Sequence, residues 1–116
     1  MTPIISQFDK AAKTHSAKLA VKDEHQTISY ALLAKNSKKL AAHMLRKRVK
    51  PGDKIGFLLE SSIDYFIALL ACFRVGAVYV PLDSRQPITR LRYMLDQAEV
   101  NYLLLNSASF KLFDAL

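Results

Sequence analysis

Short apolar runs alternate with segments of helical period between residues 54 and 105, and this alternation constrains the fold more than any other feature. The apolar runs are Lys54–Leu59, Val78–Val80 and Tyr102–Leu105. Runs that are apolar at successive positions are typical of strands buried on both faces, as in parallel sheets. Because a helical segment separates each run from the next, right-handed crossovers would make the strands parallel. The predicted fold class is therefore α/β, a three-layer parallel sheet with flanking helices.

Helices are predicted at about residues 30–48 and 63–75, and from Pro87 or Ile88 to about residue 97, where apolar residues recur at helical spacing. Their predicted inward stripes are Leu33, Leu40, Ala41 and Met44 in the first, Ile63, Phe66, Ile67 and Leu70 in the second, and Leu91, Met94, Leu95 and Ala98 in the third. A hydroxyl can cap a helix N-terminus, so Ser29 is predicted to cap the first helix and Ser61 or Ser62 the second. Gly76 is predicted to end the second helix in the left-handed conformation.

The two ends of the chain carry shorter patterns. Helical spacing predicts an opening amphipathic helix that contains Ile4, Ile5, Phe8, Ala11 and Ala12. Leu19–Val21 and Thr27–Ile28 favour strands, and the polar residues 23–26 between them predict a small hairpin. At the other end, Phe110–Leu116 is predicted to form a short helix or a frayed tail.

Length and cysteine content exclude several classes of protein. A chain of 116 residues is at most one domain. Its longest apolar run, Tyr65–Phe73, has nine residues, whereas a membrane-spanning helix needs about 20, so no membrane span is expected. The one cysteine, Cys72, excludes an internal disulfide and lies within that run, so we expect it to be buried. A reducing compartment such as the cytoplasm fits this cysteine usage.

The positive charge is concentrated in the first half of the chain. Residues 1–54 contain twelve Lys and Arg and four Asp and Glu. Residues 55–116 contain five Lys and Arg and six Asp and Glu. Such asymmetry is typical either of a surface for nucleic acid or acidic lipid, or of a solvated face within a larger protein. The helix predicted at residues 30–48 carries cations without an interleaved aromatic platform, so nucleic-acid binding is only a remote alternative.

The sequence contains none of the common motifs for nucleotide, metal or hydrolytic chemistry. There is no G-x-G-x-x-G, no G-x-x-x-x-G-K-[ST], no H-E-x-x-H and no G-x-S-x-G. His15, His25 and His43 lack ligand spacing, and the one adjacent carboxylate pair, Asp23 and Glu24, falls in a predicted turn. We therefore assign no catalytic, cofactor-binding or metal-binding residue to this chain.

Two segments resemble the core motifs of adenylation domains. Ile28–Leu33 resembles the first motif, L-[TS]-Y-x-E-L, and Phe73–Asp83 resembles the second, L-K-A-G-x-A-Y-[VL]-P-[LI]-D. Val49–Ile55 and Pro87–Asp96 are similar to the family's V-x-P-G-D-x-V and P-x-x-R-L-x-Y-x-L-x-D segments. The second motif is the specific one, and its matching residues are Gly76, Tyr79, Pro81, Leu82 and Asp83, with Arg74 in place of Lys. The departures are Leu32 where the first motif has Glu, and Val75 and Val78 where the second has Ala.

The resemblance implies that residues 1–116 are the N-terminal part, or subdomain, of an AMP-binding adenylation domain. Complete members use ATP and Mg²⁺ to make an acyl-adenylate from a carboxylate. They then pass the acyl group to a thiol of coenzyme A or of a carrier protein's phosphopantetheine arm. The family's catalytic motifs do not match this chain, so the fragment is expected to be inactive alone. Its implied partners are the remainder of the domain and a carrier protein.

The form of the second motif, with Tyr79 to Asp83 reading Y-V-P-L-D, favours nonribosomal peptide synthetases over acyl-CoA synthetases. Tyr79 and Asp83 are expected to support the structure rather than to contact a ligand. The alternative function is a non-catalytic interaction module that associates with itself or with another domain. An uncovered sheet edge or apolar patch would favour such association, including a homo-oligomer.

Overall fold

The computed structural model describes residues 3–23, 26–60, 62–105 and 111–114. Its elements in chain order are α1 (Pro3–Thr14), β1 (Leu19–Lys22), β2 (Thr27–Ser29), α2 (Tyr30–Arg46), β3 (Lys54–Leu58), α3 (Ser62–Val75), β4 (Val78–Pro81), α4 (Ile88–Ala98), β5 (Tyr102–Leu105) and β6 (Lys111–Asp114). The opening helix, the hairpin and the strand–helix alternation from residue 54 to residue 105 are all confirmed.

The main sheet has the strand order β4-β3-β5-β6. β3 pairs in parallel with both β4 and β5, and Ile55 lies opposite Tyr79 on one side and Tyr102 on the other. β6 pairs antiparallel with β5, so the predicted helix or frayed tail is wrong for residues 111–114. The free edge of β5 offers unpaired backbone groups, and pairing with it satisfies more of them than a single helical turn would. Phe110 and Leu116 lie outside the described residues.

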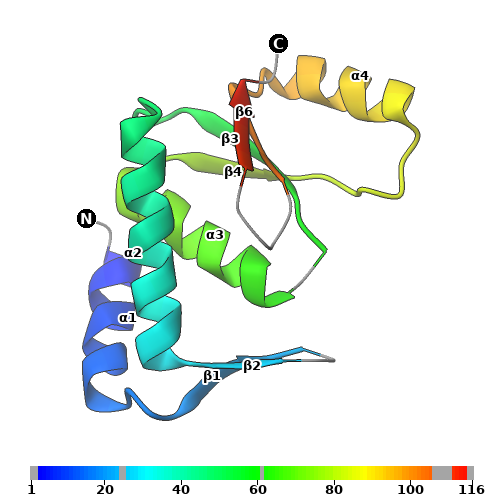
Figure 1. The fold of residues 1–116 in the computed structure, drawn as a ribbon. Helices are drawn as coiled ribbons and strands as arrows, with labels where there is room; N and C mark the ends of the chain where they lie inside the picture. Colours follow the sequence, from blue (N-terminus) through cyan, green and yellow to red (C-terminus); the bar gives the residue numbers. More distant parts are fainter. Residues whose placement is uncertain (1–2, 24–25, 61, 106–110, 115–116) are drawn as a thin grey trace.

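The elements form layers, as Figure 1 shows. α3 lies between the main sheet and the antiparallel β1–β2 sheet, and α4 lies on the opposite face of the main sheet. Alternation along β3 explains this arrangement: Ile55 and Phe57 are fully buried in the core with the helices. A Cβ placed at Gly56, between them, would face Leu95 of α4 at 3.4 Å. The predicted three-layer parallel sheet with flanking helices is therefore confirmed.

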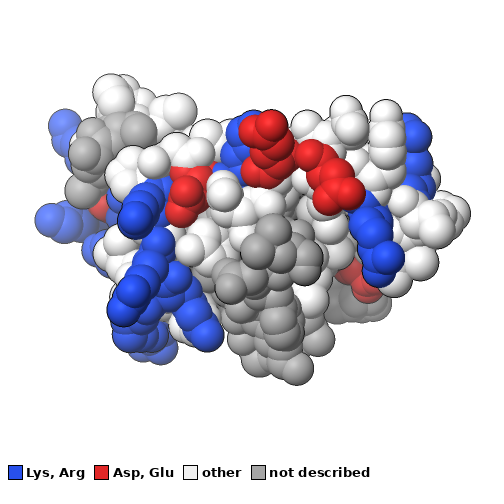
Figure 2. Space-filling model, turned by 90° about the horizontal axis from the view of Figure 1, so that it is seen from above, with Lys and Arg blue, Asp and Glu red and all other residues white. Residues whose placement is uncertain are grey.

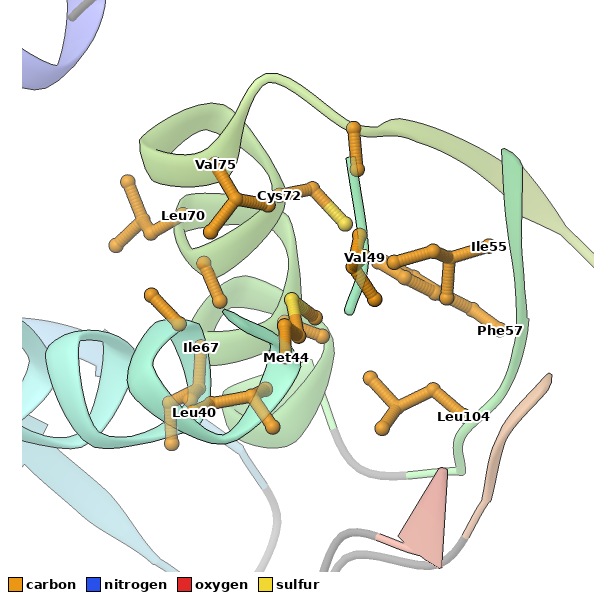
Figure 3. Packing of buried hydrophobic residues seen from close by; sticks show 14 of the residues in the cluster. Leu40, Met44, Val49, Ile55, Phe57, Ile67, Leu70, Cys72, Val75 and Leu104 are labelled. Atoms are coloured by element: carbon orange, nitrogen blue, oxygen red, sulfur yellow. The ribbon is translucent and has the colours of Figure 1, made fainter. Parts of the chain in front are cut away.

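The hydrophobic core fills the space between α2, α3 and the main sheet. Figure 3 shows Leu40 and Met44 of α2, Ile67 of α3, and Phe57 and Leu104 of the sheet pointing toward one another. Cys72 is fully buried as predicted, and burial raises the pKa of its thiol to about 12. The predicted inward stripe of α2 is confirmed, since all four of its residues are buried.

Two predicted inward stripes are partly wrong. Phe66 is 44% exposed, although the other three predicted residues of α3 are buried. α3 is apolar on nearly all sides, so its period does not select one face. In α4 no residue is buried, and Leu91, Met94, Leu95 and Ala98 are only half-buried. Among the described elements, α4 packs on one face of the sheet, and Figure 1 shows no other helix or strand against its outer side.

Local signals at the helix ends behave as predicted where they are described. The Ser29 hydroxyl accepts a hydrogen bond from the Leu32 N–H at 3.2 Å, and Gly76 has φ +78° after the end of α3. After α2, Arg48 takes the left-handed conformation with φ 68°. Ser61, the alternative cap of α3, and Glu24 and His25 of the hairpin turn lie outside the described residues.

Candidate functional site

Two segments that resemble family motifs meet where β3 and β4 begin. The Gly52 N–H donates to the Gly76 carbonyl at 2.9 Å, and the Val78 N–H donates to the Asp53 carbonyl at 2.8 Å. Gly52 and Gly76 both have positive φ, and a Cβ at Gly76 would lie 3.3 Å from Pro51. The chain turns tightly at both positions, which explains why glycine suits them. The arrangement fixes the relative position of the two strands.

An aromatic cluster joins β3, β4 and α3. The rings of Phe57 and Tyr65 are 5.3 Å apart at 82°, and the rings of Phe57 and Tyr79 are 5.8 Å apart. Tyr65 and Tyr79 meet edge to face at 6.5 Å. Burial, and secondarily the charge of Tyr79, raise the pKa of Tyr65. Edge-to-face pairs of this kind stabilise packing, so Tyr79 supports the junction between β4 and α3.

The end of the second motif forms a loop held by its own side chains. The Leu82 N–H donates to the Phe57 carbonyl at 3.1 Å. The Asp83 carboxylate accepts the Arg85 backbone N–H at 2.9 Å and the Arg85 Nε–H at 3.0 Å. The hydrogen bond from the Arg85 side chain is the main reason why the pKa of Asp83 is lowered. Asp83 therefore organises the loop after β4, in the structural role that the sequence predicts.

A hydrogen-bonded clamp that the sequence analysis missed joins three helices. The Arg74 guanidinium binds both carboxylate oxygens of Asp9, at 2.7 and 2.9 Å. The Arg74 Nε–H also donates to the Ser37 hydroxyl at 3.0 Å, and that hydroxyl donates to the Ala34 carbonyl. The hydrogen bond from Arg74 is the main reason why the pKa of Asp9 is lowered. The motif position held by Arg74 thus ties α3 to both α1 and α2.

An apolar groove of about 550 Å³ lies between α1, α3 and the β1–β2 sheet. Phe66, Leu69 and Phe73 of α3 line one side, and Ile4 and Phe8 of α1 line another. Phe66 and Ile4 are exposed at its mouth. Lys22 is the one charged residue in the lining. The groove therefore offers a large apolar surface, in whose described lining Lys22 and Tyr30 carry the polar groups.

The other residues considered as metal ligands or catalytic groups lie in different parts of the fold. His15 follows the end of α1, His43 lies in α2, and Asp23 accepts the Gln26 N–H within the hairpin. Across the parts of the chain that the structure describes, no three His, Cys, Asp or Glu side chains gather in a way that could hold a metal ion. Of the helices in those parts, none combines the length and the apolarity that crossing a bilayer requires.

Comparison with known proteins identifies relatives of this chain. Residues 8–115 match the family model described as "AMP-binding enzyme". The chain is 34% identical over 103 residues to the hybrid PKS-NRPS synthetase apdA of Emericella nidulans. The matched region covers 89% of this chain and 3% of that protein. It is 33% identical over 108 residues to bacitracin synthase 3 of Bacillus licheniformis, covering 93% of this chain and 2% of that protein. The chain thus spans a small part of each curated relative.

Solved structures of similar fold lead to the same family. The N-terminal subdomain of Klebsiella oxytoca NpsA has a TM-score of 0.81 and 26% identity, over 94% of this chain and 29% of that one. The O-succinylbenzoate coenzyme A synthetase MenE of Bacillus subtilis, solved with AMP, has a TM-score of 0.77 and 26% identity, over 87% of this chain and 26% of that one. The chain belongs to the AMP-binding enzyme family and corresponds to an N-terminal segment of an adenylate-forming domain.

Proposed function

We propose that this chain is the structural N-terminal part of an amino-acid or fatty-acid adenylation domain and is inactive alone. In the complete domain, ATP and a carboxylate would form an acyl-adenylate, whose acyl group passes to a thiol of coenzyme A or of a carrier protein. The chain would contribute the parallel sheet and the helices that hold it. The lone buried Cys72 fits a reducing compartment, so we place the protein in the cytoplasm.

The observation that carries this proposal is that side chains of the second motif are bound to other residues of this chain. Arg74 binds Asp9, Tyr79 packs in the aromatic cluster, and Asp83 binds Arg85. Each of these three side chains already has a partner within the chain. Their roles support a scaffold in which the reacting groups come from elsewhere in the domain.

The described residues do not fit ATP or Mg²⁺, which the family implies for its complete members. Gly52 lies in the turn before β3 and Gly76 in the turn before β4, where the two are hydrogen-bonded, and Gly56 is covered by the side chains of Leu82 and Leu103. The Gly52 N–H is already bonded to the Gly76 carbonyl, and the described carboxylates do not gather for a metal ion. We therefore route no chemical step through these residues.

The relatives favour the amino-acid branch. Bacitracin synthase 3 and a linear gramicidin synthase subunit of Brevibacillus parabrevis are each at least 33% identical to this chain. NpsA has also been solved as an artificial adenylation–PCP fusion, and PCP is the kind of partner that the proposed thiol transfer requires. MenE, a coenzyme A synthetase, keeps the acyl-CoA branch as the second possibility.

A chimera tests the proposal. This chain would replace the matching segment of full-length NpsA, whose N-terminal subdomain has been solved with anthranilyl-AMSN. ATP–pyrophosphate exchange is then measured with anthranilate and with a panel of amino acids, and unaltered NpsA serves as the control. We expect the chimera to exchange with anthranilate, because the scaffold does not select the acid. A folded chimera that lacks exchange, or that prefers another acid, would refute the scaffold role.

The second candidate function is an interaction module that associates with itself. The apolar groove favours it, because Phe66 and Ile4 are exposed at the groove's mouth. Val78 and Tyr79 of the edge strand β4 are exposed as well. Sedimentation velocity over a wide range of concentration tests this function: association predicts a rising sedimentation coefficient, and a constant monomer value contradicts it.

A further inference from the structure

The solvent side of α2 carries cations and no carboxylate, and the turn after it adds three cations beside Asp53. We call this surface the basic face, and its residues are Lys35, Lys38, Lys39, Arg46, Lys47, Arg48 and Lys50. All seven are exposed, and the sequence of α2 contains no Asp or Glu. Figure 2, which looks down on the C-terminal end of α2, shows Lys and Arg side chains gathered on the side of the molecule where α2 lies.

The carboxylates near the basic face are engaged elsewhere. Both oxygens of Asp9 bind Arg74, and one oxygen of Asp53 accepts the backbone N–H of Lys50 at 2.8 Å. Between described residues, no cation of the basic face forms an ion pair. Lys35 and Lys39 are four residues apart on the helix, where like charges repel. The basic face is therefore a concentration of positive charge without a direct ion pair among the described residues, and the electrostatic attraction of Lys38 to Asp9 offsets only part of it.

An aliphatic side chain lies at the edge of this positive surface. Leu45 is 60% exposed, and Ala42, one turn earlier, is exposed too. The turn beyond Leu45 places Arg48 in the left-handed conformation, for which glycine is better suited. A cation thus occupies a position where glycine would strain the backbone less. The surface combines many cations with an exposed aliphatic side chain, and protein interfaces bury both kinds of group.

This combination favours one kind of partner. Phosphate contacts with nucleic acid depend on charge and do not require an exposed aliphatic side chain. Nucleic-acid surfaces also commonly present aromatic rings for stacking, whereas the exposed side of α2 between Lys35 and Arg46 presents none. An acidic protein surface can match both the charge and the exposed leucine, and charge complementarity guides such encounters.

We infer that the basic face, together with Leu45 at its edge, binds an acidic surface of another protein domain that presents an apolar side chain to Leu45. This inference does not depend on the proposed adenylation role. Its failure would leave the NpsA chimera test unaffected, because that test measures catalysis by the assembled domain.

The test uses a synthetic amphipathic helical peptide with a leucine stripe flanked by glutamates, measured by fluorescence anisotropy with the full chain. The charge variant is Lys39→Glu with Arg46→Glu, and its matched control is Arg90→Glu with Arg92→Glu on α4. Each pair lowers the formal net charge from +7 to +3, because each exchange removes two charges. We expect the first pair to weaken binding by about tenfold or more and the control by about twofold or less.

The contribution of the Leu45 side chain to binding is tested without a change of charge. Leu45→Ser should weaken peptide binding by about fivefold, whereas Leu19→Ser, at an exposed leucine of β1, should leave it unchanged. Circular dichroism checks that every variant keeps its helix content, and Lys39→Gln with Arg46→Gln replaces a charge variant that does not fold. Equal weakening by the two charge pairs would overturn the inference. So would an unaffected Leu45→Ser, or tighter binding of duplex DNA or phosphatidylserine vesicles than of the peptide.

Discussion

Replacing Arg74 by alanine should destabilise the packing of α1 and α2 against α3. The variant removes hydrogen bonds of 2.7 and 2.9 Å to Asp9 and of 3.0 Å to Ser37. The side chain of Arg74 is 9% exposed and that of Asp9 is 22% exposed. Breaking a fully buried pair costs about 3–5 kcal/mol. Because water can reach the stranded Asp9 carboxylate, we expect a smaller loss of about 2–3 kcal/mol in the free energy of unfolding.

Urea unfolding measures this loss. For a slope of about 1–3 kcal/mol per molar, the midpoint should fall by about 0.7–3 M. Arg74→Lys, which restores the residue of the family motif, keeps the charge but loses the paired geometry and should cost about 1 kcal/mol. A double-mutant cycle with Asp9→Asn should give a coupling energy of about 1–2 kcal/mol. A coupling near zero, or an Arg74→Ala midpoint equal to that of the unaltered protein, would refute the clamp.

The clamp also predicts a dependence of stability on pH. The pKa of Asp9 is lower in the folded chain than its ordinary value, chiefly through the hydrogen bond from Arg74. A lowered folded pKa stabilises the protein fully above the unfolded pKa of about 3.9. That stabilisation is lost as the pH falls from there through the folded pKa. Arg74→Ala should therefore lose less stability between neutral pH and acid than the unaltered protein, and equal losses would contradict this origin.

Three further changes follow from the geometry of the sheet and core. Gly56→Val should cost about 1–3 kcal/mol in urea unfolding, because a Cβ there would lie 2.9 Å from Leu82 and 3.0 Å from Leu103; an unchanged midpoint would contradict this packing. The buried Cys72, with its pKa raised to about 12, should react with iodoacetamide at pH 8 only as fast as the protein unfolds, and prompt labelling of the folded chain would contradict its burial. Pro81→Thr should increase self-association in light scattering, because it adds an N–H donor to the exposed edge strand β4; no increase would show that this edge is blunted by something else.

The strands and helices from residue 54 to residue 105 could be predicted because their signals are local. Apolar runs of strand length, helical periods between them, and single residues such as Ser29 and Gly76 each act within a few positions. The parallel pairing then follows from connection length. The same reasoning failed for Phe66, because the surroundings of a helix that is apolar on nearly all sides depend on distant elements. It also failed for β6, where pairing with β5 decides the conformation of a four-residue segment.

The clamp could not be derived from local patterns, because Asp9 and Arg74 are 65 positions apart. Two signals nevertheless pointed to it. Arg74 is the one cation within the apolar segment of α3, and Ser37 lies among the buried positions of α2. A buried cation and a buried hydroxyl both need partners. The need for a partner could be predicted from the sequence, but the identity of that partner, Asp9, could not.

The most direct test of the central claim is ATP–pyrophosphate exchange by the purified chain alone. The reaction is run with ATP, Mg²⁺ and each proteinogenic amino acid or fatty acid in turn, beside a heat-denatured sample of the same chain. A scaffold whose motif side chains are bound within the fold predicts exchange no higher than in the denatured sample for every acid. Exchange above that background with any acid, abolished by denaturation, would contradict the claim that the reacting groups lie elsewhere.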